Sequence, residues 1–459
     1  MNPILAFTNW VWGYPMLIWL VGGGIFLSFK IHMIQFTKLG FIMKQTIIKS
    51  IKGEDATSDG EKVSGYKAVT GALASTLGAG SIVGAAMAVG YGGPGGVFWL
   101  LVAGLVACSI KYSEVVIAMK HRERGKNEWI GGPQYYLTKA TGWKWIGVVY
   151  AVCCIICLFL AASAQIGSIV DTLGALKVPK IPATVVITLA AGLIVLGGMS
   201  RLLDFTEKIV PVMSIMYVVG GILVILLNIQ ALPGAFASIF RYAFTGRAAF
   251  GGFGGATLAM CIRWGVCRGI YSTDAGVGVT TITHVAADVN HPAQQGLWGI
   301  FEVVSTIAIC LITCLVILVT GVWETNSSAA TLTLAGFQAG IGKAAGGFIV
   351  TVALLLFCFT TAVAQTLFGC GQMVKLFGNH ASVWGKYVFL GLMFVGGIVG
   401  ISTIINYVDF MSALLIFINM LGIYMRSNEI KEVTEEYFKN PERWEHEMWE
   451  PWKKANEEK

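Results

Sequence analysis

Apolar stretches long enough to cross a lipid bilayer recur along the whole chain, and this feature limits the possible folds more than any other. A spanning helix needs about 20 apolar residues. Charged residues make up only 12% of the 459 residues, about half the share usual in soluble domains. The sequence therefore predicts an all-α polytopic membrane protein with the lipid bilayer around it. We expect eleven transmembrane helices, near residues 14–33, 66–91, 94–119, 143–170, 182–200, 209–231, 250–279, 296–322, 344–374, 384–400 and 404–425.

The distribution of basic residues predicts the orientation, because cytoplasmic loops carry an excess of Lys and Arg. With the N-terminus outside, about sixteen of them fall on the cytoplasmic side and about five on the other. We therefore expect a multi-pass protein of the cell membrane with a cytoplasmic C-terminus. The net charge of +7 follows from this bias and gives no reason to expect nucleic-acid binding. The cytoplasmic set is Lys38, Lys44, Lys49, Lys52, Lys62, Lys111, Lys120, Arg122, Arg124, Lys126, Lys139, Lys144, Arg201, Lys208, Lys375 and Lys386.

Two of the predicted spans are unusually rich in glycine. They lie at 66–93 (YKAVTGALASTLGAGSIVGAAMAVGYGG) and 250–279 (FGGFGGATLAMCIRWGVCRGIYSTDAGVGV). Glycine inside a helix costs roughly 1 kcal/mol relative to alanine, so these clusters favour a break. Unpaired backbone at membrane depth is tolerated only where protein or a watery cavity surrounds it. Two such spans at matching places indicate a transporter binding site, although a single Gly80-x-x-x-Gly84 pair is also typical of close helix packing.

The glycine-rich spans divide the chain into two similar halves. Residues 65–231 and 250–425 each hold five predicted spans, and each half begins with a broken helix. Because the number of spans per half is odd, the second half is inverted relative to the first. Residues 1–64 add one leading helix and a cytoplasmic loop, and residues 426–459 form a charged cytoplasmic tail. The prediction is a 5+5 inverted repeat with one extra N-terminal helix.

Other functional classes find little support. The six histidines fall in loops or at span ends, and the chain contains no H-E-x-x-H, G-x-S-x-G or P-loop motif, so we expect no enzyme. No selectivity-filter motif indicates a channel. Most of the ten cysteines lie in apolar runs and none forms a C-x-x-C pair in a polar loop, which favours buried thiols over zinc sites or disulfides. The tail is interpreted either as a solvated or frayed helix or as a surface helix with three tryptophans at the lipid headgroups.

Several motifs resemble those of the alanine or glycine:cation symporter family (sodium:alanine symporters). They are GGPGGVFWL at 92–100, LGAGSIVGAA at 77–86, GGPQYYL at 131–137, GVCRGIYSTDAGVG at 265–278 and FCFTTA at 357–362. This chain departs from the family at Ser81, which replaces Asn, and at Thr273-Asp274, which replaces Asn-Glu. The resemblance covers nearly the whole chain. It implies a LeuT-type fold and the import of alanine or glycine with Na⁺, without a bound cofactor.

A zwitterionic amino acid needs partners for both of its charges when it leaves water. Free backbone N–H groups at the start of a half-helix suit its carboxylate, and free carbonyls suit its ammonium group. Gln165 adds side-chain polarity, although an interhelical hydrogen bond is an equally good interpretation of this residue. The expected substrate-binding residues are Ala79, Gly80, Ser81, Gly84, Gln165, Gly269 and Thr273.

Sodium prefers oxygen ligands, and the resemblance places its site between the first broken helix and the span at 344–374. The hydroxyls of Thr360 and Thr361 are expected to join carbonyls near Ala79, Gly80 and Val83. Without the resemblance, hydroxyls that bond back to their own helix would be the simpler interpretation.

Charged residues within spans are functional candidates by default. They are Glu114, Arg263, Arg268, Asp274, Glu302 and Asp409. We expect an Arg–acid pair to brace the second broken helix. Proton coupling through Glu302 remains an alternative to sodium coupling.

Overall fold

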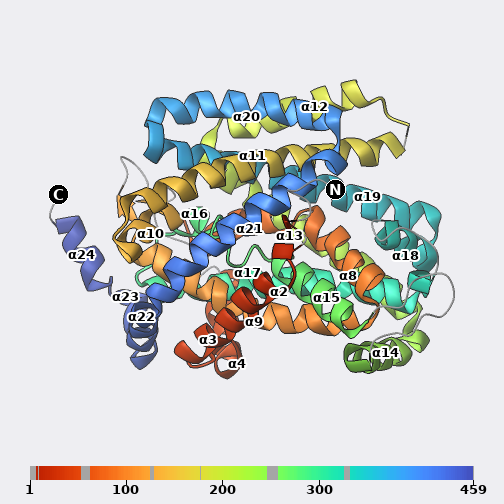
Figure 1. The fold of residues 1–459 in the computed structure, drawn as a ribbon, viewed down its shortest axis with the longest axis horizontal. Helices are drawn as coiled ribbons and strands as arrows, with labels where there is room; N and C mark the ends of the chain where they lie inside the picture. The colour runs from red at the N-terminus through yellow and green to blue at the C-terminus, as the bar shows by residue number, and fades with distance from the viewer. Residues whose placement is uncertain are drawn as a thin grey trace.

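The computed structural model describes residues 7–8, 10–52, 63–124, 129–175, 177–245, 257–324 and 331–457. Within these ranges the chain is almost entirely helical, and its one small sheet pairs β1 (Glu123–Arg124) with β2 (Trp129–Ile130) in antiparallel register. The long helices form a bundle in which α11, α12 and α20 lie along one edge (Figure 1). Part of the predicted loop (53–62) and the start of the second glycine-rich span (250–256) lie outside the described residues.

The helices follow one another without long irregular connections. In the first half they are α2 (Tyr14–Leu17), η1 (Ile18–Gly22), α3 (Gly23–Lys30), α4 (Ile34–Thr37), α5 (Leu39–Met43), η2 (Lys44–Ile48), α6 (Lys49–Ile51), α7 (Gly65–Thr76), η3 (Gly80–Gly84), α8 (Ala85–Gly92), α9 (Gly95–Lys120), α10 (Pro133–Thr141), α11 (Lys144–Ala175), α12 (Lys180–Val195), α13 (Gly198–Leu227), η4 (Ile229–Ala231) and α14 (Leu232–Thr245). In the second half they are α15 (Leu258–Ser272), α16 (Thr281–His284), α17 (Pro292–Val319), η5 (Val322–Glu324), α18 (Leu332–Ile341), α19 (Lys343–Phe377), α20 (Asn379–Val399), α21 (Ile401–Met425), α22 (Ser427–Lys439), α23 (Arg443–His446) and α24 (Glu450–Glu457).

Seven helices in the described ranges are long and apolar enough to cross a membrane, and the bent pair α7/α8 makes eight. The leading helix Tyr14–Lys30 and α12 are apolar but shorter. In the described part of the second glycine-rich span, Leu258–Ser272 forms a helix of 15 residues. The count of eleven spans therefore stays a prediction. The helices α14 and α18 were not predicted, because we took their segments for connections.

The first glycine-rich span is broken, as predicted. Ser64 caps the start of α7 by accepting a hydrogen bond from the N–H of Lys67 at 3.1 Å. The helix ends at Thr76, and after residues 77–79, here called the first break, the chain resumes as η3 and α8 at an angle of 62° to α7. An added Cβ at Gly78 would lie 2.9 Å from Thr361 Oγ1, so glycine is required there by the close approach of α19.

The second glycine-rich span is also interrupted. Thr257 caps α15 by accepting from the N–H of Met260 at 3.2 Å, as Ser64 caps α7. After Ser272 the chain makes a series of turns over residues 273–280, here called the second break, before the short α16 begins. Within it, Gly276 and Gly278 have φ of +88° and +87°, a conformation that glycine adopts at little cost.

Corresponding helices of the two halves pack against each other. The helix after each broken span forms the pair α9 and α17, the next pair is α11 and α19, and the third is α12 and α20. In Figure 1 the last pair lies side by side above α11. Each broken helix also contacts the other half, because α7 packs on α17 and α15 packs on α9. The breaks are thereby enclosed by long helices of both halves.

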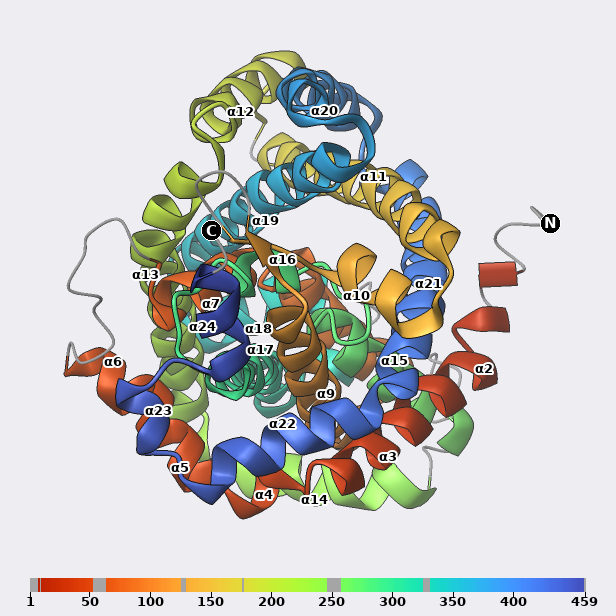
Figure 2. The ribbon, with the colours of Figure 1, turned by 90° about the vertical axis from the view of Figure 1, so that its left-hand side faces the viewer.

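The charged tail folds back onto the protein. Figure 2 shows α22 and α23 crossing one end of the bundle beside the segment α3–α5. Trp444, Trp449 and Trp452 are only 2–4% exposed, so neither of the arrangements expected for the tail describes these side chains. The guanidinium of Arg122 lies over the rings of Trp129 and Trp452, 4.2 and 3.9 Å from their centroids, and a desolvated contact of this kind is worth up to about 2 kcal/mol.

One basic residue was assigned wrongly. Lys111 was counted with the cytoplasmic loops, but it lies inside α9 and is completely buried. The assignment failed because we assumed that lysine stays in water, whereas buried acidic groups surround this one. Lys111 is therefore removed from the basic residues counted in the cytoplasmic loops. The excess of Lys and Arg that remains on that side still favours an external N-terminus.

Candidate functional site

A cavity of about 460 Å³ lies between the two broken helices. This volume falls in the range of about 300–1,000 Å³ typical of small-molecule sites. The first break and the start of η3 line one side, and the end of α15 and the second break line another; α11 and α21 complete the wall. The lining includes Ser75, Thr76, Gly78, Ala79, Gly80, Val83, Gly84, Gln165, Arg268, Tyr271, Asp274, Val277, Asn406, Asp409 and Ser412.

Four of the seven predicted substrate-binding residues line this cavity: Ala79, Gly80, Gly84 and Gln165. Gln165 reaches the first break, where its Oε1 accepts a hydrogen bond from the N–H of Ala79 at 3.4 Å. An added Cβ at Gly80 would meet only the ring of Tyr271, at an ordinary contact distance of 3.6 Å. The backbone at Gly80 is therefore approachable from the cavity.

The other three lie behind the wall. Ser81 is buried and donates to the carbonyl of Thr76 at 3.1 Å, which helps to close the end of α7. Thr273 is buried and donates to the carbonyl of Ile270 at 2.9 Å. Gly269 lets α15 approach α9, since an added Cβ would lie 2.8 Å from the carbonyl oxygen of Leu100. In the structure these three residues shape the two broken helices.

The two threonines of α19 differ in what they contact. Thr360 donates to the carbonyls of Leu356 and Phe357 on its own helix, both at 3.0 Å. Thr361 instead reaches across to α7, with its hydroxyl 2.9 Å from the carbonyl oxygen of Ala74 and 3.3 Å from that of Leu77. Val83, Ala79 and Gly80 line the adjacent cavity. Thr361 thus belongs to a group of oxygens at the first break, whereas Thr360 makes the local bonds expected of a helical threonine.

Charged groups of both signs stand on the cavity wall. Arg268 of α15 lies over the rings of Trp264 and Tyr271, 5.1 and 5.7 Å from their centroids. Asp409 of α21 lines the same cavity, and among the described residues its Oδ1 has no hydrogen-bond partner. Asp274 adds a second acid. Contact of the cavity with these charges was not expected from the sequence, although their position inside apolar spans marked them as candidates.

The second break is held by side chains from three helices. The carbonyl of Asp274 accepts from Lys111 Nζ at 3.0 Å, that of Gly276 accepts from Asn419 at 2.9 Å, and that of Val277 accepts from the hydroxyl of Tyr150 at 2.6 Å. These donors come from α9, α21 and α11. A lysine whose acidic partners are Glu114 and Glu302 therefore helps to hold the break. The expected Arg–acid brace of the second broken helix stays a prediction, for which Arg268 and Asp409 on the same cavity wall are the candidates.

The comparisons with known proteins agree with this architecture. The model of the sodium:alanine symporter family matches residues 1–450 of the chain. The chain belongs to this family. It is a multi-pass membrane transporter and not an enzyme, because the family consists of symporters.

Relatives cover nearly the full length. The chain is 37% identical to the transporter YflA of Bacillus subtilis over 94% of this chain and 92% of the relative. It is 31% identical to the sodium/alanine symporter AgcS of Methanococcus maripaludis over 94% and 95%. A crystal structure of a mutant manganese transporter from Eremococcus coleocola has a TM-score of 0.51 and 12% identity, covering 81% of this chain and 77% of that one. This last likeness concerns the fold alone.

Proposed function

We propose that the protein is a sodium-coupled symporter that imports a small neutral amino acid, alanine or glycine or both, by alternating access. The observation that carries the proposal is the cavity between two interrupted helices, which presents approachable backbone at Gly80 together with Arg268 and Asp409. A zwitterion entering this cavity meets groups of both signs. The family to which the chain belongs supports sodium and alanine as cargo.

The proposed sodium site lies at the first break. Thr361 and the carbonyls of Ala74 and Leu77 bring three oxygens together where α7 ends, and sodium takes hydroxyl and carbonyl oxygens as ligands. The predicted set of Ala79, Gly80, Val83, Thr360 and Thr361 remains a proposal. The contacts favour Thr361 within it, because the hydroxyl of Thr360 faces its own helix.

A LeuT-type inverted repeat is supported by the packing of matching helices against each other, α9 on α17, α11 on α19 and α12 on α20. Both broken helices also begin with a hydroxyl cap, Ser64 in one half and Thr257 in the other. With an odd number of spans per half, these pairs are antiparallel partners. Alternating access then consists of one set of helices moving against the other around the two breaks.

Proton coupling through Glu302 is the rival mechanism. Glu302 does not line the cavity. Its Oε1 lies 3.6 Å from Lys111 Nζ, and its Oε2 lies 3.0 Å from His284 Nε2. Because both of its oxygens have buried partners, Glu302 is better suited to a fixed structural role than to exchanging protons with the cavity.

Uptake of labelled alanine into liposomes that carry the purified protein tests the proposal. Sodium and pH gradients are imposed separately. Concentrative uptake under the sodium gradient alone is expected. Uptake driven only by the pH gradient would replace sodium by protons, and the absence of alanine or glycine uptake under either gradient would reject the proposed cargo.

A further inference from the structure

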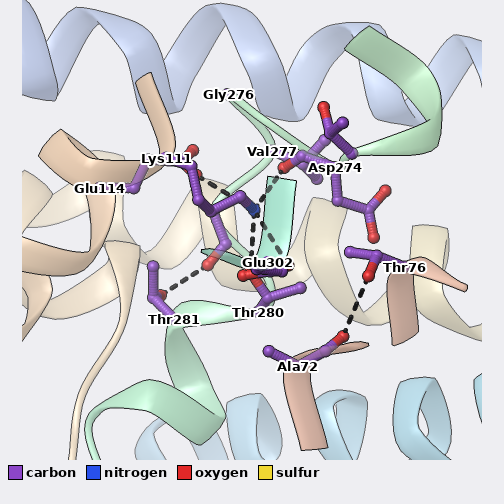
Figure 3. A network of polar contacts seen from close by, with 12 residues as sticks. Ala72, Thr76, Lys111, Glu114, Asp274, Gly276, Val277, Thr280, Thr281 and Glu302 are labelled. Atoms are coloured by element: carbon purple, nitrogen blue, oxygen red, sulfur yellow. Dashed lines mark hydrogen bonds and ion pairs between the residues drawn. The ribbon is translucent and has the colours of Figure 1, made fainter. Parts of the chain in front are cut away.

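Lys111 is an ammonium group enclosed in the protein interior. It lies in α9, and its side chain is completely buried, as are those of Glu114 and Glu302. Burying a charge is costly unless it is paired and hydrogen-bonded. Its Nζ lies 3.5 Å from Glu114 Oε2 and 3.6 Å from Glu302 Oε1, and it donates to Thr280 Oγ1 at 2.9 Å (Figure 3). These oxygens, on several sides of the ammonium group, offset the free-energy cost of burying its charge.

Separate partners hold the two acids in position around the ammonium group. Glu302 contacts His284, whose other ring nitrogen lies 2.8 Å from Gln295 Nε2. Glu114 Oε1 accepts from Asn419 Nδ2 at 2.7 Å. Among the described residues, Glu114 Oε2 and Glu302 Oε1 have no hydrogen-bond partner and face Lys111 as ion pairs. The result is a preformed shell of oxygens that a tethered cation fills.

The same ammonium group joins both ends of the second break. It donates to the carbonyl of Asp274 at the start of the break and to the hydroxyl of Thr280 at its end. Between these residues, Ala275, Val277 and Val279 line the cavity. Figure 3 shows the side chain of Lys111 pointing towards residues of this loop and towards Glu302. Lys111 therefore contacts both ends of a loop that forms one wall of the cavity, although it does not itself line the cavity.

From this geometry we propose that Lys111 is a positioning residue for transport. Its ammonium acts as a built-in cation that holds residues 273–280 in the conformation that forms the cavity wall. This inference rests on the proposed function for its effect on alanine, but its effect on the loop does not depend on the cargo. A small alkylammonium ion has the chemistry to replace the lost group when the lysine is shortened.

The experiment compares three variants of the purified full-length protein. Lys111→Ala removes the ammonium and leaves space for methylammonium. The double variant Lys111→Met, Glu302→Gln removes one charge of each sign at similar volume, so that one buried acid, Glu114, loses its ion-pair partner instead of two. Lys120→Ala is the matched control, because Lys120 lies on the same helix but pairs with Glu429 of the tail at 2.7 Å.

Two readouts separate this inference from the proposed function. Hydrogen–deuterium exchange of residues 273–280 needs no cargo, and the exchange rate is expected to rise at least about tenfold in both Lys111 variants, on the scale of a lost hydrogen bond to a charged group. In liposomes, the KM for alanine is expected to rise by a similar factor while the maximal rate changes much less. Methylammonium should reverse both effects in Lys111→Ala and leave Lys120→Ala unchanged.

Exchange of residues 273–280 at the wild-type rate in a folded Lys111 variant would overturn the inference. If Lys111→Ala does not fold, the double variant decides by the same measurement. If the wild-type protein takes up neither alanine nor glycine, the proposed cargo fails, and the exchange measurement still tests the role of Lys111.

Discussion

The hydroxyl of Thr361 on α19 lies 2.9 Å from the carbonyl oxygen of Ala74 on α7, a residue 287 positions earlier in the chain. The neighbouring Thr360 makes no such crossing and bonds to carbonyls of its own helix. Two adjacent threonines therefore face different environments, and they can be separated by experiment.

Thr361→Val is expected to shift the sodium dependence of uptake to higher sodium concentrations, because valine keeps the shape but removes an oxygen at the first break. The loss should be about 1.5–3 kcal/mol in sodium affinity. Because binding of the two cargoes is reciprocally coupled, the apparent affinity for alanine should fall at subsaturating sodium and recover as sodium is raised. Thr360→Val should have a smaller effect. Equal effects of the two variants on the sodium titration would contradict this assignment.

A side chain at Gly80 should block the site in proportion to its size. An added Cβ would make only an ordinary contact, 3.6 Å from Tyr271, so Gly80→Ala should retain much of its alanine binding. Gly80→Leu should abolish uptake while the protein still folds, because the larger side chain would extend into the cavity and keep the substrate from the backbone of the first break. The binding of labelled alanine to the purified protein is measured for both variants. Normal binding by the leucine variant would place the substrate elsewhere.

The orientation can be tested with single cysteines. All ten native cysteines are buried or partly buried, so the background reaction with an impermeant thiol reagent should be low. Lys177→Cys, in the exposed turn before α12, should react when reagent is added outside intact cells, and Lys38→Cys, between α4 and α5, should react only after the cells are opened. The reverse pattern would invert the predicted topology.

The docking of the tail should withstand moderate acid. Burial raises the pKa of Glu429 on α22, but hydrogen bonds from His121 and Lys120 outweigh it and lower the pKa from 4.5 to about 2. An acid with a depressed pKa stabilises the folded form fully above its unfolded value, and this contribution is lost as the pH falls from about 4.5 towards 2. Exchange protection of residues 427–439, corrected for intrinsic rates, should be no lower at pH 5 than at pH 7.

Glu429→Gln removes the same charge at every pH. Its tail should exchange faster than that of the wild-type protein at pH 7 and pH 5, and the difference should shrink below about pH 4 as the wild-type carboxylate becomes protonated. A constant difference down to pH 3 would show that the charge of Glu429 does not hold the tail.

The sequence predicted the helical membrane architecture and both breaks, because apolar length and glycine clusters act locally. It also predicted that Gly80 and Gln165 matter, and both line the cavity. Other assignments depended on how helices rotate against each other, which a single sequence does not reveal. Ser81 and Gly269 turned away from the cavity for this reason.

Lys111 shows a different limit. A lysine in an apolar run could have been recognised as a buried functional charge, but apart from Glu114 on the same helix its partners come from α17 and from the second break, more than 160 residues away. Similarly, the tryptophans of the tail could be recognised as amphipathic but not assigned a partner. Their neighbours, His291 and Arg122, come from other parts of the chain.

The carbonyls of Asp274, Gly276 and Val277 are bound by donors from α9, α21 and α11. The four consecutive residues 274–277 thus form a joint, which is hydrogen-bonded to three separate helices. If α9, α21 or α11 tilts, residues 274–277 must move with that helix, or the hydrogen bond between them must break. The joint therefore converts independent helix movements into a concerted one, and substitutions far apart on those helices should show non-additive effects on transport rate.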